Sequence, residues 1–265
     1  MPRRAGVMAA RAMWKGVIRF AEVEVPVKLY SAVQDRSVHF RLLHAKDRSP
    51  VKQAMVNPDT DEVVPHAETR RAYRTDEGSL VVFDKQELEA LEPDSGRDIE
   101  VIRFMPPQAI DHRWYDRPYY LGPDGSESLY FALAEALANS GKEGLARWVM
   151  RKKSYVGALR LHRGVPMLMS LRHEEQVVPV DALEPPKGKA LDAKELDMAR
   201  QLISMLEAEF DPDEYHDEYR ERVLELIEAK RRGKSVKVTP IRRREASDDL
   251  SKALEASLKK ERKRA

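Results

Sequence analysis

Cysteine is absent from the 265 residues of this chain. Its absence excludes disulfide bridges, thiolate metal sites and cysteine nucleophiles. Long apolar runs are also missing, since none approaches the roughly 18 residues that a membrane span needs. The first residues, MPRRAGVMAARAMWKG, contain no apolar core of signal-peptide length. We therefore expect a cytoplasmic protein that has no contact with membranes.

Catalytic and nucleotide-binding motifs are scarce as well. The chain has no GxGxxG, and a P-loop-like piece at residues 233–235 lacks the first glycine because Glu228 stands there. There is no GxSxG motif, and His39 and His44 fall on opposite faces of an expected strand, which does not suit a metal pair. The acids of residues 207–218 could bind a divalent ion or could be solvated helix-start acids. The sequence thus favours a protein that is not an enzyme and has no cofactor or metal, with a metal-dependent nuclease as a rival.

Charge is distributed unevenly along the chain. The formal net charge is only +2. Residues 230–265 nevertheless contain 14 Lys/Arg and five Asp/Glu, whereas the preceding 229 residues contain 33 basic and 40 acidic residues. A basic tail on a mildly acidic body predicts a polyanionic partner, most often nucleic acid, although it could also serve only solubility.

Short strands with frequent turns dominate the first part of the chain. Apolar residues alternate with polar ones over residues 23–29 and again over 38–42, which is the period of a half-buried strand. This pattern predicts a barrel or a sandwich. Further strands are expected over residues 14–20, 80–83, 99–104, 146–150, 155–161 and 166–171.

Helical signals appear between and after these strands. Asp84 and Glu87 form a capping box that predicts a short helix, and residues 126–140 predict a longer one that stops at Gly141. The expected apolar face of the longer helix consists of Leu129, Leu133, Ala136 and Leu137.

The period becomes helical throughout after residue 183. Asp192 and Glu195 form a second capping box, and Asp211 with Pro212 predicts the start of a helix that Gly233 ends. The stripe along this last helix consists of Tyr215, Tyr219, Val223, Leu226 and Ile227. A short amphipathic helix is then expected around Leu250, Leu254 and Leu258.

Basic side chains gather at three places on the expected β scaffold. Each group could hold phosphate oxygens, and each could equally be ordinary solvated surface. No helix-turn-helix, zinc finger or stacking motif accompanies them, so they favour contact with a backbone without base readout. The groups are Lys46, Arg48 and Lys52; Arg70, Arg71 and Arg74; and Arg147, Arg151, Lys152 and Lys153.

Four blocks of sequence resemble one family. They are WKGVIRF…VPVKLYSAVQDRSVHFRLLHAKD (14–47), YDRPYYLGPDG (115–125), GLARWVMRKKSYVGALR (144–160) and EFDPDEYHDEYRERVLELIEAK (209–230). Because the blocks occur in the family's order, the chain resembles the prokaryotic Ku proteins over residues 12–258. It departs from many relatives in having Ala21 and Glu24 in the first block.

The resemblance implies a mixed β/α fold: a Ku-type β-barrel with a bridging insertion and a C-terminal helical arm, assembled as a ring-forming homodimer. Such a ring threads onto a double-stranded DNA end, protects it, and recruits the ATP-dependent DNA ligase D in non-homologous end joining. A nucleoid-associated protein is therefore implied. The corresponding regions are a flexible N-terminus (1–11), the barrel core with its DNA-encircling bridge (12–185), the helical arm for dimerisation (186–233), and a linker with a ligase-recruiting segment and basic tail (234–265).

The same resemblance assigns residues to these roles. It implies DNA contacts by Lys28, Arg151 and Lys152, to which we add Lys46, Arg48, Lys52 and Arg147. It assigns ligase recruitment to Leu250, Leu254 and Leu258, and extra DNA affinity to the basic tail of Lys259, Lys260, Arg262, Lys263 and Arg264. Packing in or near the dimer interface is expected for Leu196, Leu202, Leu206, Tyr215, Tyr219 and Leu226.

Alternatives remain for several of these assignments. Lys28 could be the solvent face of its strand, and Arg147 could pair with Glu143 at i,i+4. The rival to the ring is a non-encircling nucleic-acid-binding β-barrel, and a pure interaction scaffold is also possible.

Overall fold

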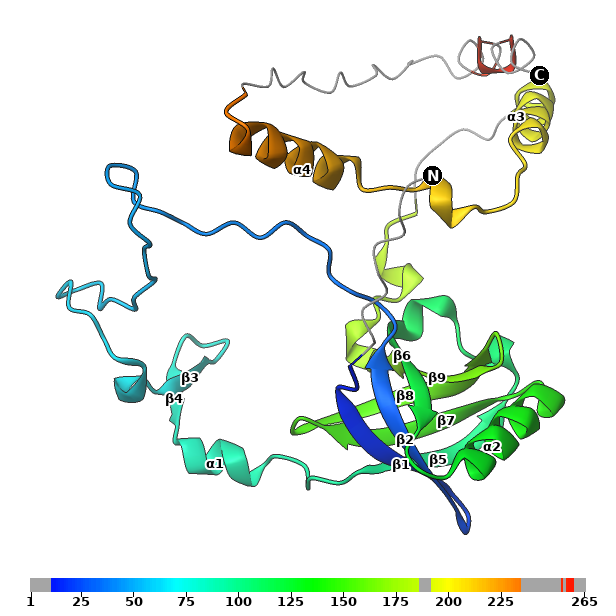
Figure 1. Ribbon diagram of the computed structural model, residues 1–265, viewed down its shortest axis with the longest axis horizontal. Coiled ribbons are helices and arrows are strands. Elements are labelled where there is room, and N and C mark those ends of the chain that lie inside the picture. The colour runs from blue at the N-terminus through cyan, green and yellow to red at the C-terminus, as the bar shows by residue number, and fades with distance from the viewer. Residues whose placement is uncertain (1–10, 186–191, 235–253, 255, 260–265) are drawn as a thin grey trace. The chain divides into compact units, whose positions relative to one another are not determined.

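The structure is a computed structural model that describes residues 11–185, 192–234, 254 and 256–259 (Figure 1). The chain divides into two compact units. One unit holds the described residues up to Arg36 together with Arg41–Ala182, and the second holds Ser37–Phe40 and the described residues from Leu183 onward. No helix in these described ranges has the length and apolarity to cross a membrane.

The first unit is built around a closed seven-stranded barrel (Figure 1). The strands follow the order β1-β2-β6-β9-β8-β7-β5, and a parallel pairing of β1 with β5 closes the ring. All other neighbours in the ring are antiparallel. The strands are β1 (Trp14–Phe20), β2 (Val23–Ser31), β5 (Asp98–Met105), β6 (Tyr115–Pro123), β7 (Glu143–Met150), β8 (Lys153–His162) and β9 (Val165–Leu171).

Alternating apolar residues of these strands fill the barrel. Ile18, Val27, Leu29, Leu159 and Leu168 are fully buried in a single cluster, as the period-2 pattern predicts for strands with one face inside. The strands expected over residues 14–20, 23–29, 99–104, 146–150, 155–161 and 166–171 are thereby confirmed.

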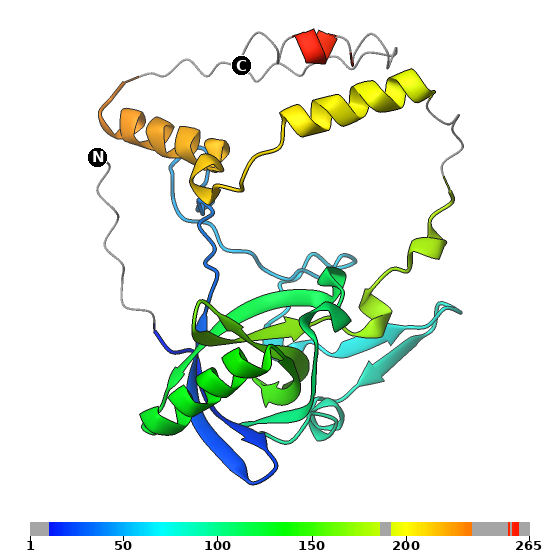
Figure 2. The same ribbon diagram turned by 90° about the vertical axis from the view of Figure 1, so that its right-hand side faces the viewer.

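Helix α2 (Glu127–Ser140) lies against β2, β6 and β8 (Figure 2). It begins after Ser126 and ends where Gly141 takes a left-handed φ of 60°, as expected. The face that it buries is rotated from the expected one: Leu129 is 46% exposed, and Ala136 is exposed too. The side chains that pack into the barrel are Tyr130, Leu133, Ala134 and Leu137.

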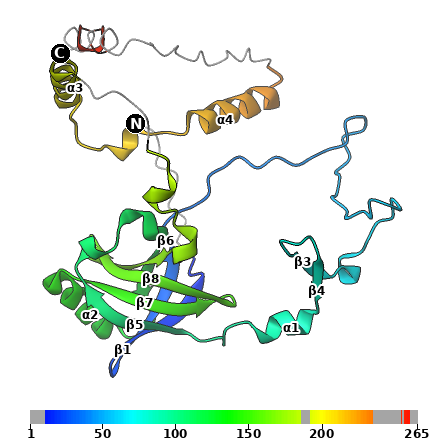
Figure 3. The same cartoon turned by 180° about the vertical axis from the view of Figure 1, so that it is seen from behind.

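A long insertion, residues 32–97, joins β2 to β5. It contains a two-stranded hairpin of β3 (Arg71–Arg74) and β4 (Leu80–Phe83), followed by α1 (Lys85–Ala90), which leads towards β5 (Figure 3). The backbone N–H of Asp84 donates to the Glu87 carboxylate over 2.8 Å, which confirms the capping box. No residue of this insertion is buried.

The strand expected over residues 38–42 is wrong. These residues form no regular ladder, and their only β pairing nearby is an isolated bridge between Leu43 and Pro50. Phe40 and Leu42 remain 68% and 69% exposed. An alternating pattern needs a neighbouring strand to become β structure, and the described chain offers none here.

The second unit contains α3 (Ala193–Met205) and α4 (Glu218–Arg231). Asp192 caps α3 by accepting from the Glu195 N–H over 2.8 Å, as expected. Helix α4 begins later than expected, because Asp211 and Pro212 start only a short 3₁₀ turn and Asp217 is the true N-cap. Neither helix buries a residue. The exposed apolar side chains of this unit include Ile203 and Tyr219 on the helices and Leu206 and Tyr215 between them.

Candidate nucleic-acid interface

The β7–β8 hairpin presents two adjacent cations at its tip. Met150 pairs with Lys153, so Arg151 and Lys152 are the two central residues of the turn. Their φ angles are 52° and 64°. A two-residue turn with both φ values positive is normally occupied by Asn-Gly or Gly-Gly, because a Cβ is strained there. This turn therefore holds two long basic side chains at a position that sterically favours small residues.

The two tip cations have different surroundings. Lys152 forms an ion pair with Glu92 at 2.7 Å, which raises the pKa of its ammonium group. Arg151 has no carboxylate partner in the part of the chain that the structure describes. The arginine is thus the tip group that is available to an external anion.

Arg117 on β6 is a further exposed cation. Burial raises the pKa of the Tyr119 hydroxyl, as do Tyr155 and the charge of Asp116, while the positive charges of Arg117 and Arg151 act in the opposite direction. Both guanidinium groups therefore lie within electrostatic reach of the same tyrosine. The sequence reasoning missed Arg117, although it belongs to the block of residues 115–125 that carried the resemblance.

Lys28 lies on β2 opposite Lys15 on β1, and both lysines contact one carboxylate. The Asp124 oxygens lie 3.0 Å from Lys15 Nζ and 3.1 Å from Lys28 Nζ. Hydrogen bonds from Lys15 first, and from Lys28, hold the pKa of the Asp124 carboxyl below its ordinary value. Lys28 therefore has a carboxylate partner of its own chain, and Asp124 competes with any external anion for it.

We predict that Asp124→Asn strengthens DNA binding. Removing the shared carboxylate leaves Lys15 and Lys28 free to contact phosphate, so duplex affinity at low salt should rise severalfold, and the salt slope should steepen by about one unit per added contact. Gel shifts over a salt series measure both. Asp98→Asn is the matched control, because Arg19 keeps its second partner Glu24 at 2.6 Å. Equal gains for both variants would show an effect of net charge alone.

Arg147 is paired across the sheet and not along its own strand. Its Nε donates to Glu100 on β5 over 2.7 Å, and this contact lowers the pKa of the Glu100 carboxyl. The pairing of Arg147 with Glu143 is wrong, because the buried Glu143 instead forms an ion pair with Arg160 at 2.7 Å. Cross-strand register decides both partners.

Lys46, Arg48 and Lys52 lie on the insertion, where all three are exposed. No described carboxylate forms an ion pair with any of them.

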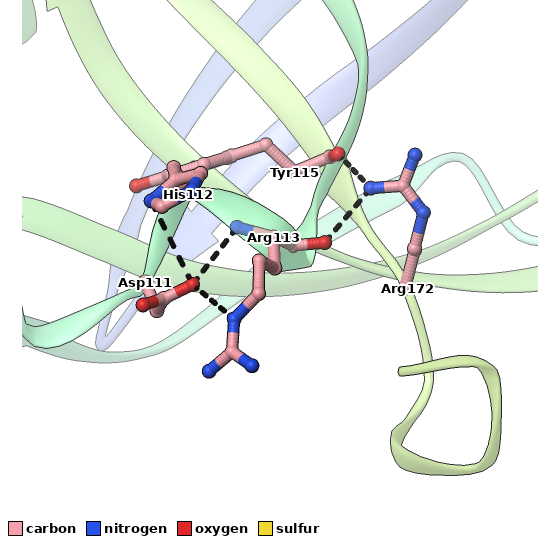
Figure 4. Close-up of polar contacts among 5 residues, drawn as sticks. All are labelled: Asp111, His112, Arg113, Tyr115 and Arg172. Carbon is pink, nitrogen blue, oxygen red and sulfur yellow. Dashed lines mark hydrogen bonds and ion pairs between the residues drawn. The ribbon is translucent and has the colours of Figure 1, made fainter. Parts of the chain in front are cut away.

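A further arginine braces the entry to β6 (Figure 4). Arg172 donates to the carbonyl oxygens of Arg113, over 2.9 Å, and of Tyr115. Asp111 in turn accepts from Arg113 Nε over 2.8 Å, and the pKa of its carboxyl is lowered mainly by this bond. These contacts satisfy the backbone of the turn before β6, so Arg172 fixes a loop and is not a free cation.

The C-terminal assignments fall mostly outside the described residues. Leu254 and residues 256–259 are helical, with Leu258 only 8% exposed. The helix expected here is confirmed for these positions. Leu250, Lys260, Arg262, Lys263 and Arg264 lie outside the described residues, whereas Lys259 is described and exposed.

The closed barrel, the long exposed insertion and the cationic hairpin tips together allow the class of protein to be recognised. The family model described as "Ku70/Ku80 beta-barrel domain" matches residues 19–198. The chain belongs to the Ku family.

Bacterial relatives place it more narrowly, among the non-homologous end joining proteins. The chain is 37% identical over 255 residues to "Non-homologous end joining protein Ku 2" of Geotalea uraniireducens, covering 96% of this chain and 99% of the relative. It is 36% identical over 237 residues to the Ku protein of Coxiella burnetii (87% and 86% covered). It is 35% identical over 260 residues to that of Mycolicibacterium smegmatis (94% and 82% covered).

Proposed function

We propose that the chain binds double-stranded DNA ends as a homodimeric ring and acts in double-strand break repair by non-homologous end joining. The observation that supports a DNA contact is the tip of the β7–β8 hairpin. There, Arg151 is unpaired among the described residues, and Lys152 lies beside it. A twofold dimer presents this tip twice. Contacts of this kind read charge and shape and not base sequence.

The homodimer is supported by apolar surface that one chain leaves uncovered. Phe210, Tyr215 and Tyr219 of the second unit are 77%, 69% and 72% exposed. Apolar patches of this kind on a water-soluble unit mark contact with a partner. The helical arm, residues 186–233, is therefore proposed as the dimerisation region, and residues 12–185 as the barrel core with its bridge.

The remaining chain is proposed to recruit a partner. Leu250, Leu254 and Leu258 at i, i+4, i+8 match the spacing of a helix that docks in a groove. We assign this segment to the recruitment of ATP-dependent DNA ligase D, and the basic tail after it to additional DNA affinity. The proposed site of action is the nucleoid, in the cytoplasm.

Exonuclease protection tests end binding. The full chain at saturating concentration should slow digestion of a blunt linear duplex from both ends at moderate salt. The protection should fall steeply as salt rises, because the logarithm of the binding constant falls with the logarithm of the salt concentration by about 0.9 per neutralised phosphate. A duplex that is digested at the unprotected rate at every salt concentration would contradict the proposal. Degradation of the DNA by the chain and magnesium, without added exonuclease, would favour a nuclease instead.

A further inference from the structure

Two turns in the insertion share one backbone design. In the first, the His44 N–H donates to the Ser49 carbonyl over 2.8 Å, and the Arg48 N–H donates back to His44 over 2.9 Å. An isolated β-bridge between Leu43 and Pro50 closes this turn. We call residues 43–50 the basic turn.

The second turn repeats each of these contacts at equivalent positions. The Asn57 N–H donates to the Glu62 carbonyl, and the Asp61 N–H donates back to Asn57, both over 2.9 Å. A bridge between Val56 and Val63 closes it. Arg48 and Asp61 even share the left-handed conformation, with φ of 60° and 55°. We call residues 56–63 the acidic turn.

The two turns carry opposite charge on this common frame. The basic turn has Lys46 and Arg48, while its one carboxylate, Asp47, is engaged by Ser49 and His44. The acidic turn has Asp59, Asp61 and Glu62 and no basic residue. All of these charged side chains are exposed. No ion pair joins the two turns to each other within the described chain.

Exposed apolar side chains flank both charged tips at matching positions. Leu42, Leu43 and Val51 beside the basic turn are 69%, 51% and 49% exposed. Of their counterparts beside the acidic turn, Met55 and Val56 are each 47% exposed, and Val64 is half-buried. Each turn is therefore a small unit with an apolar base and a charged tip, and no described residue of the chain buries either base.

Two equivalent frames of opposite charge in one chain are self-complementary. A twofold axis brings the basic turn of one copy onto the acidic turn of the other, and the reverse contact follows by symmetry. Burial of the apolar bases supplies the attraction, whereas the charges select which turn meets which, since like turns would repel. A DNA surface would attract the basic turn but repel the acidic one.

We propose that the basic and acidic turns are an interaction surface for a second copy of this chain, each turn docking on the opposite turn of the partner. This inference rests on the proposed homodimer, and it assigns Lys46 and Arg48 to the contact between copies. Lys52, which lies outside both turns, stays available to phosphate.

Cysteine cross-linking tests the contact, because the natural chain has no cysteine to interfere. Ala45→Cys in one tagged copy and Thr60→Cys in a second copy are co-expressed at full length without DNA, then oxidised. A covalent dimer should form from the mixture, and at least fivefold less should form from either variant alone. An equal yield in all three samples, or none in the mixture, would overturn the proposal.

Charge reversal makes the test specific. The double variant Lys46→Glu with Arg48→Glu makes both turns acidic, and the double variant Asp59→Lys with Asp61→Lys makes both turns basic. When both cysteine-bearing copies carry the same double variant, the yield of cross-linked dimer should fall severalfold. When one copy carries the first pair and its partner carries the second, the yield should return. A yield that does not return in the mixture would refute the contact between opposite turns.

Two further readouts separate the causes of a failure. Light scattering gives the mass in solution: a monomer would refute the homodimer itself, whereas a dimer without the cross-link would refute only the turn contact. If Lys46→Glu with Arg48→Glu weakens duplex binding while the cross-link is absent, the basic turn binds DNA and not a second copy.

Discussion

Replacing Arg151 and Lys152 by Asn and Gly should make the barrel more stable and its DNA binding weaker at the same time. Both residues hold positive φ angles, at which a side chain costs about 1–2 kcal/mol, and Asn-Gly removes most of that strain. The same change deletes two cations per chain and four in the proposed homodimer. Duplex affinity at moderate salt should fall by about 10- to 100-fold, and the salt slope should flatten by up to about 0.9 per lost contact.

The neighbouring β8–β9 hairpin supplies the control. Arg163 and Gly164 occupy its turn with φ of 49° and 81°, so glycine already stands at the second position. Arg163→Asn should also stabilise the barrel in thermal unfolding but leave duplex affinity unchanged. If the Asn-Gly variant at 151–152 keeps its affinity and slope, the tip does not contact phosphate, whatever its stability.

Deleting residues 248–265 should abolish stimulation of a Ku-dependent ATP-dependent ligase while end binding stays within a few-fold. The helix that contains Leu254 and Leu258, which we propose docks on the ligase, is removed, but the barrel and its hairpin tip are not. Nick-free joining of a linear duplex by the ligase measures the stimulation, and a gel shift measures the end binding.

A shorter truncation separates the two halves of this tail. Removing only residues 259–265 deletes the basic end and keeps the leucines, so ligase stimulation should persist while affinity for internal duplex falls. Full stimulation by the chain that lacks 248–265 would refute the assignment of the leucines.

Local signals predicted local structure well. The capping boxes at Asp84 and Asp192 and the stop at Gly141 all stand where the sequence places them, because each depends on hydrogen bonds within one turn. Six of the seven barrel strands were equally readable, since one face of each is buried, but β6 (Tyr115–Pro123) was not predicted. The failures arise where the outcome depends on a neighbour: residues 38–42 alternate without a strand to pair with, and α2 turns a different face to the barrel.

The candidate site was only partly predictable for the same reason. The sequence shows that Arg151 and Lys152 are basic and near a turn, but not that both adopt positive φ. It gives no sign that Asp124 lies between Lys15 and Lys28, or that Glu100 and not Glu143 contacts Arg147, since these partners lie on other strands. The Ku resemblance supplied the family, and the structure then gave Lys28 and Arg147 the carboxylate partners Asp124 and Glu100.

Competition between linear and circular DNA tests the central claim most directly. A labelled linear duplex bound by the chain is challenged at moderate salt with the same sequence, either as a linear fragment or as a covalently closed circle, and the assay is repeated without residues 234–265. A threaded ring predicts that only the linear competitor displaces the label in the truncated chain. Equal displacement by the closed circle in that chain would show that the barrel binds along its surface and does not encircle DNA.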